Sequence, residues 1–419
     1  MIRFSGRHIR LAFFALSAAM ALALASCGGG GSSSSSSTTP TPSTTANTQA
    51  VEVNSGPVND YVNGIFTTVT ICQPGTSTCQ SIPNVLVDTG SEGLRLLSSA
   101  VTLSLPAITD NSSNGLQECV VYGDGSYNWG PIVSADIKLA GEKGSSVPIQ
   151  LIDSSNPTQY PIPSACLSGG GPDENTVQSL GANGILGIGV FQQDCGTSCT
   201  STSTMPNPAP YYLCQGTVCS AATVPVNSQV QNPVWTFPQD NNGVLVSLPS
   251  VPDTGAPSVS GSLIFGIGTQ SDNALGGAQV LLTDSNGNLQ TVYQNVSYSS
   301  FIDTGSNALY FLDATTLGIP DCTDYTSFYC PGSTQTYTVT NTGPTNGNTS
   351  QVTFNIANAD SLFANSANWA FNNLGGDSGT SPSTDYFDFG LPFFYGRNVF
   401  VGIENMTGPN GVIGPYFAY

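Results

Sequence analysis

Two segments of this chain carry the same motif: Val85-Leu86-Val87-Asp88-Thr89-Gly90-Ser91 and Phe301-Ile302-Asp303-Thr304-Gly305-Ser306. Each motif follows a short apolar run of the kind found in buried strands. Leucines stand six and nine residues beyond the aspartate in both copies, so the chain contains an internal repeat. The aspartates are 215 residues apart (303 minus 88), enough for each to belong to its own lobe. We therefore expect two carboxylates in twin settings to meet at one acid/base site between the lobes.

A third Asp-Thr-Gly, at Asp253-Thr254-Gly255, has a different context. It lies between Pro252 and Pro257, and flanking prolines disfavour a paired strand. The sequence predicts a turn there, outside the acid/base site.

The N-terminal segment predicts export. Residues 1–27 combine three arginines with the apolar run Leu11 to Leu24, which is too short to span a membrane. The ending Leu24-Ala25-Ser26-Cys27 resembles the lipobox of bacterial lipoproteins. That resemblance implies lipidation of Cys27 and a membrane anchor in the cell envelope, and Gly28 favours the outer membrane, facing the periplasm or the cell surface. The alternative is an ordinary secretory signal.

The remaining chain divides by composition. Residues 28–50 consist mainly of Gly, Ser, Thr and Pro without charge, and we expect a flexible tether. The folded body then begins near Val51, with an N-terminal lobe over residues 51–240 and a C-terminal lobe over residues 241–419, each large enough for its own core.

Charge excludes some functions. After removal of residues 1–27, four Lys and Arg face 26 acidic residues, a net charge of −22. Little could neutralise phosphates, so we expect no nucleic-acid partner. Few ion pairs are available to be lost in acid, which predicts tolerance of low pH. No feature predicts an oligomer, and we expect a monomer.

Histidine is missing from the predicted mature protein, because the single histidine is His8. This excludes Ser-His-Asp and Cys-His nucleophiles and disfavours a catalytic zinc site. No phosphate-binding or dinucleotide motif is present, so we expect neither cofactor nor metal. Carboxylates remain for acid/base chemistry.

Ten cysteines remain beside Cys27, an even number in an exported chain. Four pairs follow from closeness in sequence and the fifth from elimination: Cys72–Cys79, Cys195–Cys199, Cys214–Cys219, Cys322–Cys330 and Cys119–Cys166. The alternative, a metal site of the four cysteines between 195 and 219, is disfavoured by irregular spacing and an oxidising compartment.

Strand signals dominate the body, as short β-branched and aromatic runs between turn residues, and predict an all-β fold. Short helices are expected near Thr176 to Leu180 and Ser361 to Phe363. A second apolar-Gly element follows in each half, Asn183 to Gly189 and Phe387-Asp388-Phe389-Gly390.

These elements together resemble the pepsin-like aspartic peptidases. The match includes both motifs, both apolar-Gly elements, the segment Val121 to Ser126, which is similar to the family's flap hairpin, and Gly261 to Gly266, which is similar to its inter-lobe strand. The resemblance implies a bilobal fold of two related β-barrel-like lobes with an active-site cleft between them.

The resemblance also implies roles for residues. Asp88 and Asp303 would be the catalytic pair that activates a water to hydrolyse a peptide or protein substrate. Gly90, Gly305, Ser91 and Ser306 would hydrogen-bond these carboxylates, and Thr89 and Thr304 would brace the loops. The flap would be Tyr122, Gly123, Asp124, Gly125 and Ser126, with Tyr122 closing over substrate.

Two departures from the family stand out. Arg95 occupies the position of a usual Trp, and two interpretations stay open: stacking on Tyr122 beside the cleft, or surface pairing with Glu92. The tether also lacks the basic residues of a family propeptide. The alternatives to an aspartic endopeptidase are therefore a non-catalytic pepsin-like envelope lipoprotein that binds a peptide or another ligand in its cleft, and an unrelated structural β protein of the envelope.

Overall fold

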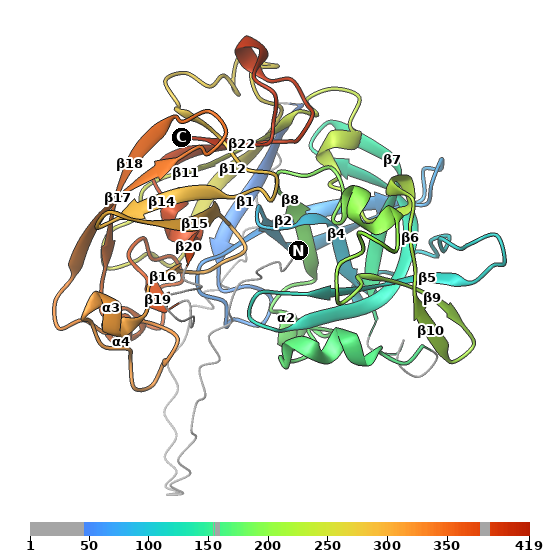
Figure 1. Ribbon diagram of the computed structural model, residues 1–419, viewed down its shortest axis with the longest axis horizontal. Coiled ribbons are helices and arrows are strands. Elements are labelled where there is room, and N and C mark those ends of the chain that lie inside the picture. Colours follow the sequence, from blue (N-terminus) through green and yellow to red (C-terminus); the bar gives the residue numbers. More distant parts are fainter. Residues whose placement is uncertain (1–45, 154, 156–159, 378–385) are drawn as a thin grey trace, which may run out of the picture.

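The computed structural model describes residues 46–153, 155, 160–377 and 386–419. The predicted signal segment, Cys27 and most of the expected tether lie outside these residues. Strands dominate in two lobes that lie side by side (Figure 1), which confirms the all-β, bilobal prediction. No helix in the described part of the chain is long and apolar enough to cross a membrane.

The N-terminal lobe is built on a closed barrel. Its strands, in order around the barrel, are β6 (Tyr127–Leu139), β7 (Glu142–Ile152), β4 (Glu92–Leu97), β8 (Gly184–Ile188), β3 (Cys79–Asp88) and β2 (Gly64–Cys72), and β2 pairs back onto β6. A hairpin extension continues from β6 through β5 (Gly115–Val121), β9 (Tyr211–Gln215) and β10 (Val218–Ala221). Every residue of β8 is buried, as expected for a strand covered on both faces.

An inter-lobe sheet joins the two halves. It continues from β2 through β1 (Thr48–Asn54), β12 (Val259–Phe265), β11 (Gly243–Leu248), β21 (Arg397–Gly402), β22 (Tyr416–Ala418) and β13 (Val280–Leu282). The segment compared with the family's inter-lobe strand is therefore β12, in the middle of this sheet. Strands from the start, middle and end of the described chain thus pair with one another.

The C-terminal lobe contains a seven-stranded sheet. Its order is β18 (Thr349–Ile356), β17 (Gln335–Thr342), β14 (Leu289–Tyr293), β15 (Val296–Ile302), β20 (Tyr386–Phe389), β16 (Leu309–Phe311) and β19 (Gly375–Asp377). Phe311 lies at the centre of its core and contacts the rings of Tyr337, Phe354 and Phe387.

Helices are short. They are α2 (Val177–Leu180), α3 (Ala314–Leu317) and α4 (Ala359–Phe363), with 3-10 turns at Ser98–Ala100, Ser164–Gly169, Gly196–Thr200, Val226–Ser228, Val234–Thr236, Leu391–Phe394 and Pro409–Gly411. Helices α2 and α4 coincide with the two predicted helical segments. Asp253-Thr254-Gly255 forms the predicted turn, in which Gly255 N donates to Pro252 O at 2.8 Å.

One boundary differs from the prediction. Strand β1 begins at Thr48, inside the segment expected to be a flexible tether up to residue 50. Asn47 is buried and its side chain donates to Phe265 O at 3.1 Å. The polar composition of Thr48-Gln49-Ala50 concealed a strand, because its backbone pairs with β12 whatever its side chains are.

Candidate active site

The first Asp-Thr-Gly-Ser motif forms a tight loop at the end of β3. Strand β3 runs parallel to β8, and their register places Asp88 opposite Gly187. Gly90 N donates to Asp88 Oδ1 at 2.8 Å, and the Ser91 hydroxyl donates to Asp88 Oδ2. The first apolar-Gly element thus supports the loop that holds Asp88.

The second motif repeats this arrangement at the end of β15. Strand β15 runs parallel to β20, and Asp303 N donates to Phe389 O at 3.1 Å. Gly305 N donates to Asp303 Oδ1 at 2.7 Å, and Ser306 Oγ donates to Asp303 Oδ2 at 2.9 Å. Equivalent donors therefore surround both carboxylates.

The two carboxylates face each other across the lobe interface. A Cβ atom added to Gly90 would lie 2.7 Å from both carboxylate oxygens of Asp303, and one on Gly305 would lie 2.5 Å from Asp88 Oδ1. The side chains of Asp88 and Asp303 are within hydrogen-bonding reach, and they are 1% and 0% exposed. Only glycine leaves room for this approach.

Two threonines lock the loops together. Thr89 N donates to Thr304 Oγ1 and Thr304 N donates to Thr89 Oγ1, both at 3.0 Å. Each hydroxyl then donates to the opposite lobe, from Thr89 to Ile302 O at 3.0 Å and from Thr304 to Val87 O at 2.8 Å. Four buried hydrogen bonds therefore fix the separation of the carboxylates.

Burial and like charges shape the electrostatics. Desolvation raises the pKa of Asp303 well above its usual value, and the nearby charges of Asp88 and Asp388 raise it further. The Ser306 hydrogen bond opposes this shift but does not cancel it. The pair can therefore hold one proton between two carboxylates, which is the state that general acid/base hydrolysis requires.

The predicted flap residues, Tyr122, Gly123, Asp124, Gly125 and Ser126, form the turn between β5 and β6. The Tyr122 side chain is 1% exposed and its hydroxyl donates to Asn128 Oδ1. Gly125 O accepts from Gly171 N at 3.0 Å. The tip of this hairpin therefore packs against the segment after the Ser164–Gly169 turn.

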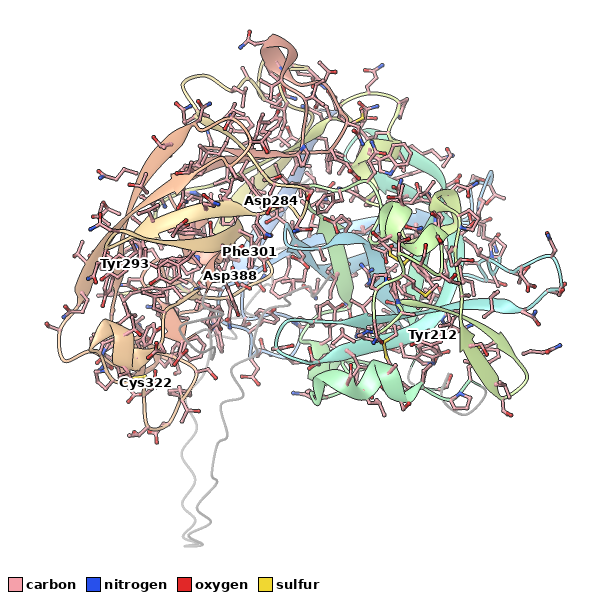
Figure 2. All side chains as sticks on the ribbon, in the orientation of Figure 1. Tyr212, Asp284, Tyr293, Phe301, Cys322 and Asp388 are labelled. Atoms are coloured by element: carbon pink, nitrogen blue, oxygen red, sulfur yellow. A yellow bond between two sulfur atoms is a disulfide. The ribbon has the colours of Figure 1, made fainter. Side chains whose placement is uncertain are left out.

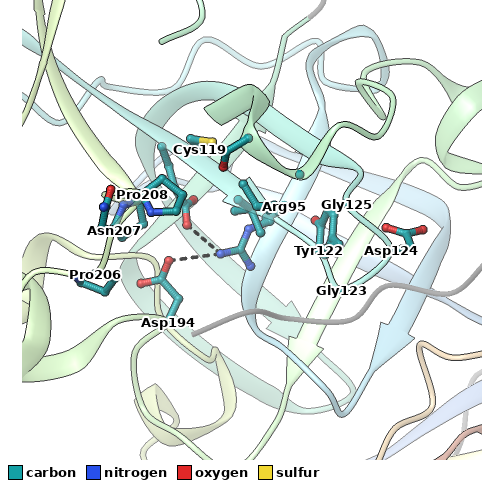
Figure 3. A pocket seen from close by; sticks show the side chains of 16 residues that line it. Arg95, Cys119, Tyr122, Gly123, Asp124, Gly125, Asp194, Pro206, Asn207 and Pro208 are labelled. Carbon is teal, nitrogen blue, oxygen red and sulfur yellow. Dashed lines mark hydrogen bonds and ion pairs between the residues drawn. The ribbon is translucent and has the colours of Figure 1, made fainter. Parts of the chain in front are cut away.

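Arg95 is neither at the surface nor paired with the Glu92 carboxylate, so that interpretation is wrong. It is 1% exposed, and its Nη2 forms ion pairs with Glu118 at 2.8 Å and Asp194 at 3.2 Å (Figure 3). Its contact with Glu92 goes to the backbone oxygen, at 2.6 Å. Glu118 and Asp194 are 23 and 99 residues away in sequence, which hid them from local pattern analysis.

This ionic cluster lies in the wall of a cavity of about 390 Å³ beside the flap. Tyr122, Asp124 and Pro208 line the same cavity, but neither Asp88 nor Asp303 does. Burial lowers the pKa of Arg95, yet the charges of Glu118, Tyr122 and Asp194 outweigh it and keep the guanidinium protonated. Burial raises the pKa of Glu118. The positive charge of Arg95 opposes this shift, and the negative charge of Asp194 adds to it.

Asp388 is a carboxylate that sequence reasoning recorded only as part of an apolar-Gly element. It lies on β20, is 3% exposed, and is close enough to contribute to the electrostatics of Asp303. The signal was present in the sequence: the corresponding run in the first half, Gly184 to Gly187, contains no acid.

All five predicted disulfides are present in the structure. They are Cys72–Cys79, Cys119–Cys166, Cys195–Cys199, Cys214–Cys219 and Cys322–Cys330. The pair assigned by elimination, Cys119–Cys166, ties β5 at the base of the flap to the Ser164–Gly169 turn.

Fold and site geometry together define a bilobal protein of the pepsin-like fold class. A likeness to a solved structure supports this: the aspartic proteinase from Irpex lacteus superposes with a TM-score of 0.51 at 16% identity, over 88% of this chain and 96% of the proteinase. At that identity the likeness shows the fold alone. The chain belongs to the family described as a protein of unknown function (DUF3443), whose model matches residues 43–419. Among curated proteins, no sequence matches this chain.

Proposed function

We propose that this protein is an aspartic endopeptidase that hydrolyses peptide bonds with a water activated between Asp88 and Asp303. The observation that carries the proposal is the twin geometry of the two carboxylates: matched amide and hydroxyl donors, mutual approach, and loops locked by Thr89 and Thr304. A damaged copy would be expected if the cleft were kept only for binding, and neither copy is damaged.

The charges support a division of roles. Burial and the neighbouring carboxylates raise the pKa of Asp303, and the proposed mechanism starts with the shared proton on this residue. Ionised Asp88 takes a proton from the water as its oxygen attacks the peptide carbonyl carbon, while Asp303 gives its proton to the carbonyl oxygen. In the resulting tetrahedral diol, one hydroxyl returns a proton to Asp303 as the C=O bond reforms, the C–N bond breaks, and the leaving nitrogen takes the proton held by Asp88. No covalent enzyme intermediate forms.

The test is digestion of a denatured protein by the purified full chain between about pH 2 and 7. Asp88→Asn and Asp303→Asn should each abolish cleavage without unfolding the protein. Asp253→Asn is the matched control, because it changes the aspartate of the third Asp-Thr-Gly, which is exposed in a turn. A statine-type mimic of the tetrahedral species should bind the wild type.

The second candidate is a binding module, favoured by the cavity beside the flap, which does not include the catalytic pair in its lining. The two candidates give opposite results. Wild-type protein that neither cleaves denatured substrate over this pH range nor binds the mimic would replace the peptidase proposal with the binding-module proposal.

A further inference from the structure

Asn63 connects the N-terminal lobe to the loop that carries Asp303. It lies between β1 and β2 and is 1% exposed. Asn63 Nδ2 donates to Asn307 O at 2.8 Å, and the two residues are 244 positions apart in sequence. Asn307 directly follows the second Asp-Thr-Gly-Ser motif. Strand β15, which leads into this motif, carries Phe301 near the middle of the molecule (Figure 2).

Every polar atom of the Asn63 side chain bonds to the C-terminal lobe. Nδ2 also donates to Phe371 O at 3.0 Å, and Oδ1 accepts from Phe371 N and from the Tyr395 hydroxyl, both at 2.8 Å. The backbone N of Asn63 donates to Trp369 O at 2.7 Å. A primary amide has two N–H donors and an oxygen with two lone pairs, so this side chain is fully satisfied across the lobe interface.

The segment that receives Asn63 is itself fixed. Trp369 N and Ala370 N donate to Ala256 O at 2.9 and 3.0 Å, and Ala256 N donates to Ala370 O at 2.9 Å. Ala256 directly follows the third Asp-Thr-Gly, so this turn supports the segment from behind. Asn63 is therefore held against a rigid part of the C-terminal lobe while it bonds Asn307.

The path from Asn307 to the carboxylate is short. Asn307 is covalently linked to Ser306, whose hydroxyl donates to Asp303 Oδ2 at 2.9 Å. The threonine hydrogen bonds hold this loop at the beginning of the motif, and Asn63 holds it just after the end. Without the second contact the Ser306 hydroxyl is free to shift, and a displacement of about 1 Å in a catalytic site can lower the rate by about 100-fold.

We propose that Asn63 is a positioning residue: from the opposite lobe it holds the end of the second motif loop, which keeps Asp303 aligned with Asp88. The catalytic part of this inference rests on the proposed peptidase function. Asn63 acts through Asn307 and Ser306. Its loss should therefore lower kcat more than it changes KM.

Asn63→Gly tests the proposal in the full chain. Glycine adopts the left-handed backbone of Asn63, whose φ is 51°, without strain, so the variant removes the side-chain hydrogen bonds alone. On a peptide substrate we expect kcat to fall about tenfold and KM to change less than about twofold.

Asn59→Gly is the matched control. It makes the same change in the same loop, at a residue with a φ of 56° and an exposed side chain, and it should leave kcat and KM unchanged. A kcat for Asn63→Gly equal to that of Asn59→Gly overturns the catalytic role of Asn63.

Amide hydrogen exchange tests the same contact without activity. In Asn63→Gly the amides of Thr304 and Gly305 should exchange about tenfold faster relative to the amides of β8, since the loop is held at one end only. A purely structural role would accelerate both regions alike. Tyr395→Phe removes a single bond to Asn63 and should produce a smaller change of the same kind, which keeps the test open if Asn63→Gly folds poorly.

The outcomes separate the two proposals. Unchanged relative exchange at Thr304 and Gly305 overturns the positioning role of Asn63, whether or not the protein is a peptidase. Faster exchange there, in a protein whose wild type cleaves nothing, supports the positioning role and sinks only the peptidase proposal.

Discussion

Single residues at this site differ in how far their surroundings can be predicted. Asp88 and Asp303 were identifiable because each carries its supporting glycine and serine within three residues. Arg95 was not, because its partners come from β5 and from the segment after β8, which only the folded barrel brings together. A buried cation between two carboxylates also means that each group depends on the others for neutralisation.

Replacement of Arg95 should therefore be costly. Arg95→Met leaves the buried carboxylates of Glu118 and Asp194 without a cation, and we expect a loss of about 3–5 kcal/mol in the free energy of unfolding at pH 7. Lys143→Met is the control: its partner Asp136 is buried, but the lysine is 42% exposed, so we expect a loss below about 1 kcal/mol. Urea unfolding measures both. Equal losses would contradict the neutralising role of Arg95.

Helices and strands were predictable from the sequence where nearby residues determine them. They were less predictable where pairing with a distant strand determines them. The two short helices have their capping residues nearby, Thr176 before α2 and Asn358 before α4. Strand β1 depends on β12, more than 200 residues later, and its start was misplaced. The flap hairpin was predictable from Tyr122 to Ser126, but its packing against Gly171 was not, since that contact joins separate segments.

Two of the disulfides should differ in how much they stabilise the folded protein. Cys119–Cys166 closes a span of 47 residues and Cys195–Cys199 one of 4. If the main effect is on the unfolded chain, replacing the first pair by alanines should lower the free energy of unfolding by about 4 kcal/mol and the second by about 2 kcal/mol. Guanidinium unfolding of the two double variants checks the order. A larger loss from the shorter link would show that native contacts dominate.

At the scale of the whole molecule, few ion pairs and several buried acids determine the response to pH. The ion pairs between described residues are those of Arg95 with Glu118 and Asp194 and of Lys143 with Asp136. Burial raises the pKa values of Glu118, Asp303 and Asp388, and raises that of half-buried Asp173 to about 6. Hydrogen bonds lower the pKa values of Asp110 and Asp313, which are partly buried, and the pKa of buried Asp136 is also lowered.

The sign of the pH dependence follows. Acids with raised folded pKa values contribute stability that is complete below about pH 4 and is lost as pH rises through those values. Acids with lowered folded pKa values contribute stability that is present above about pH 4 and is lost as pH falls below that value. We therefore expect a higher midpoint of thermal unfolding at pH 4.5 than at pH 8, measured by circular dichroism. A midpoint that drops steeply between pH 7 and pH 4.5 would contradict this balance.

The inter-lobe sheet has a consequence for the order of events during synthesis. Strand β11 has neighbours on both sides only when β21 is present, and β21 begins 94 residues after Asp303 (397 minus 303). A ribosome releases residues from the N-terminus onward, at about 5–20 per second. The N-terminal barrel can close early, but β15, whose end carries Asp303, gains its parallel neighbour β20 only after residue 389 has emerged. The complete pair of carboxylates therefore assembles only late in synthesis, after most of both lobes has emerged.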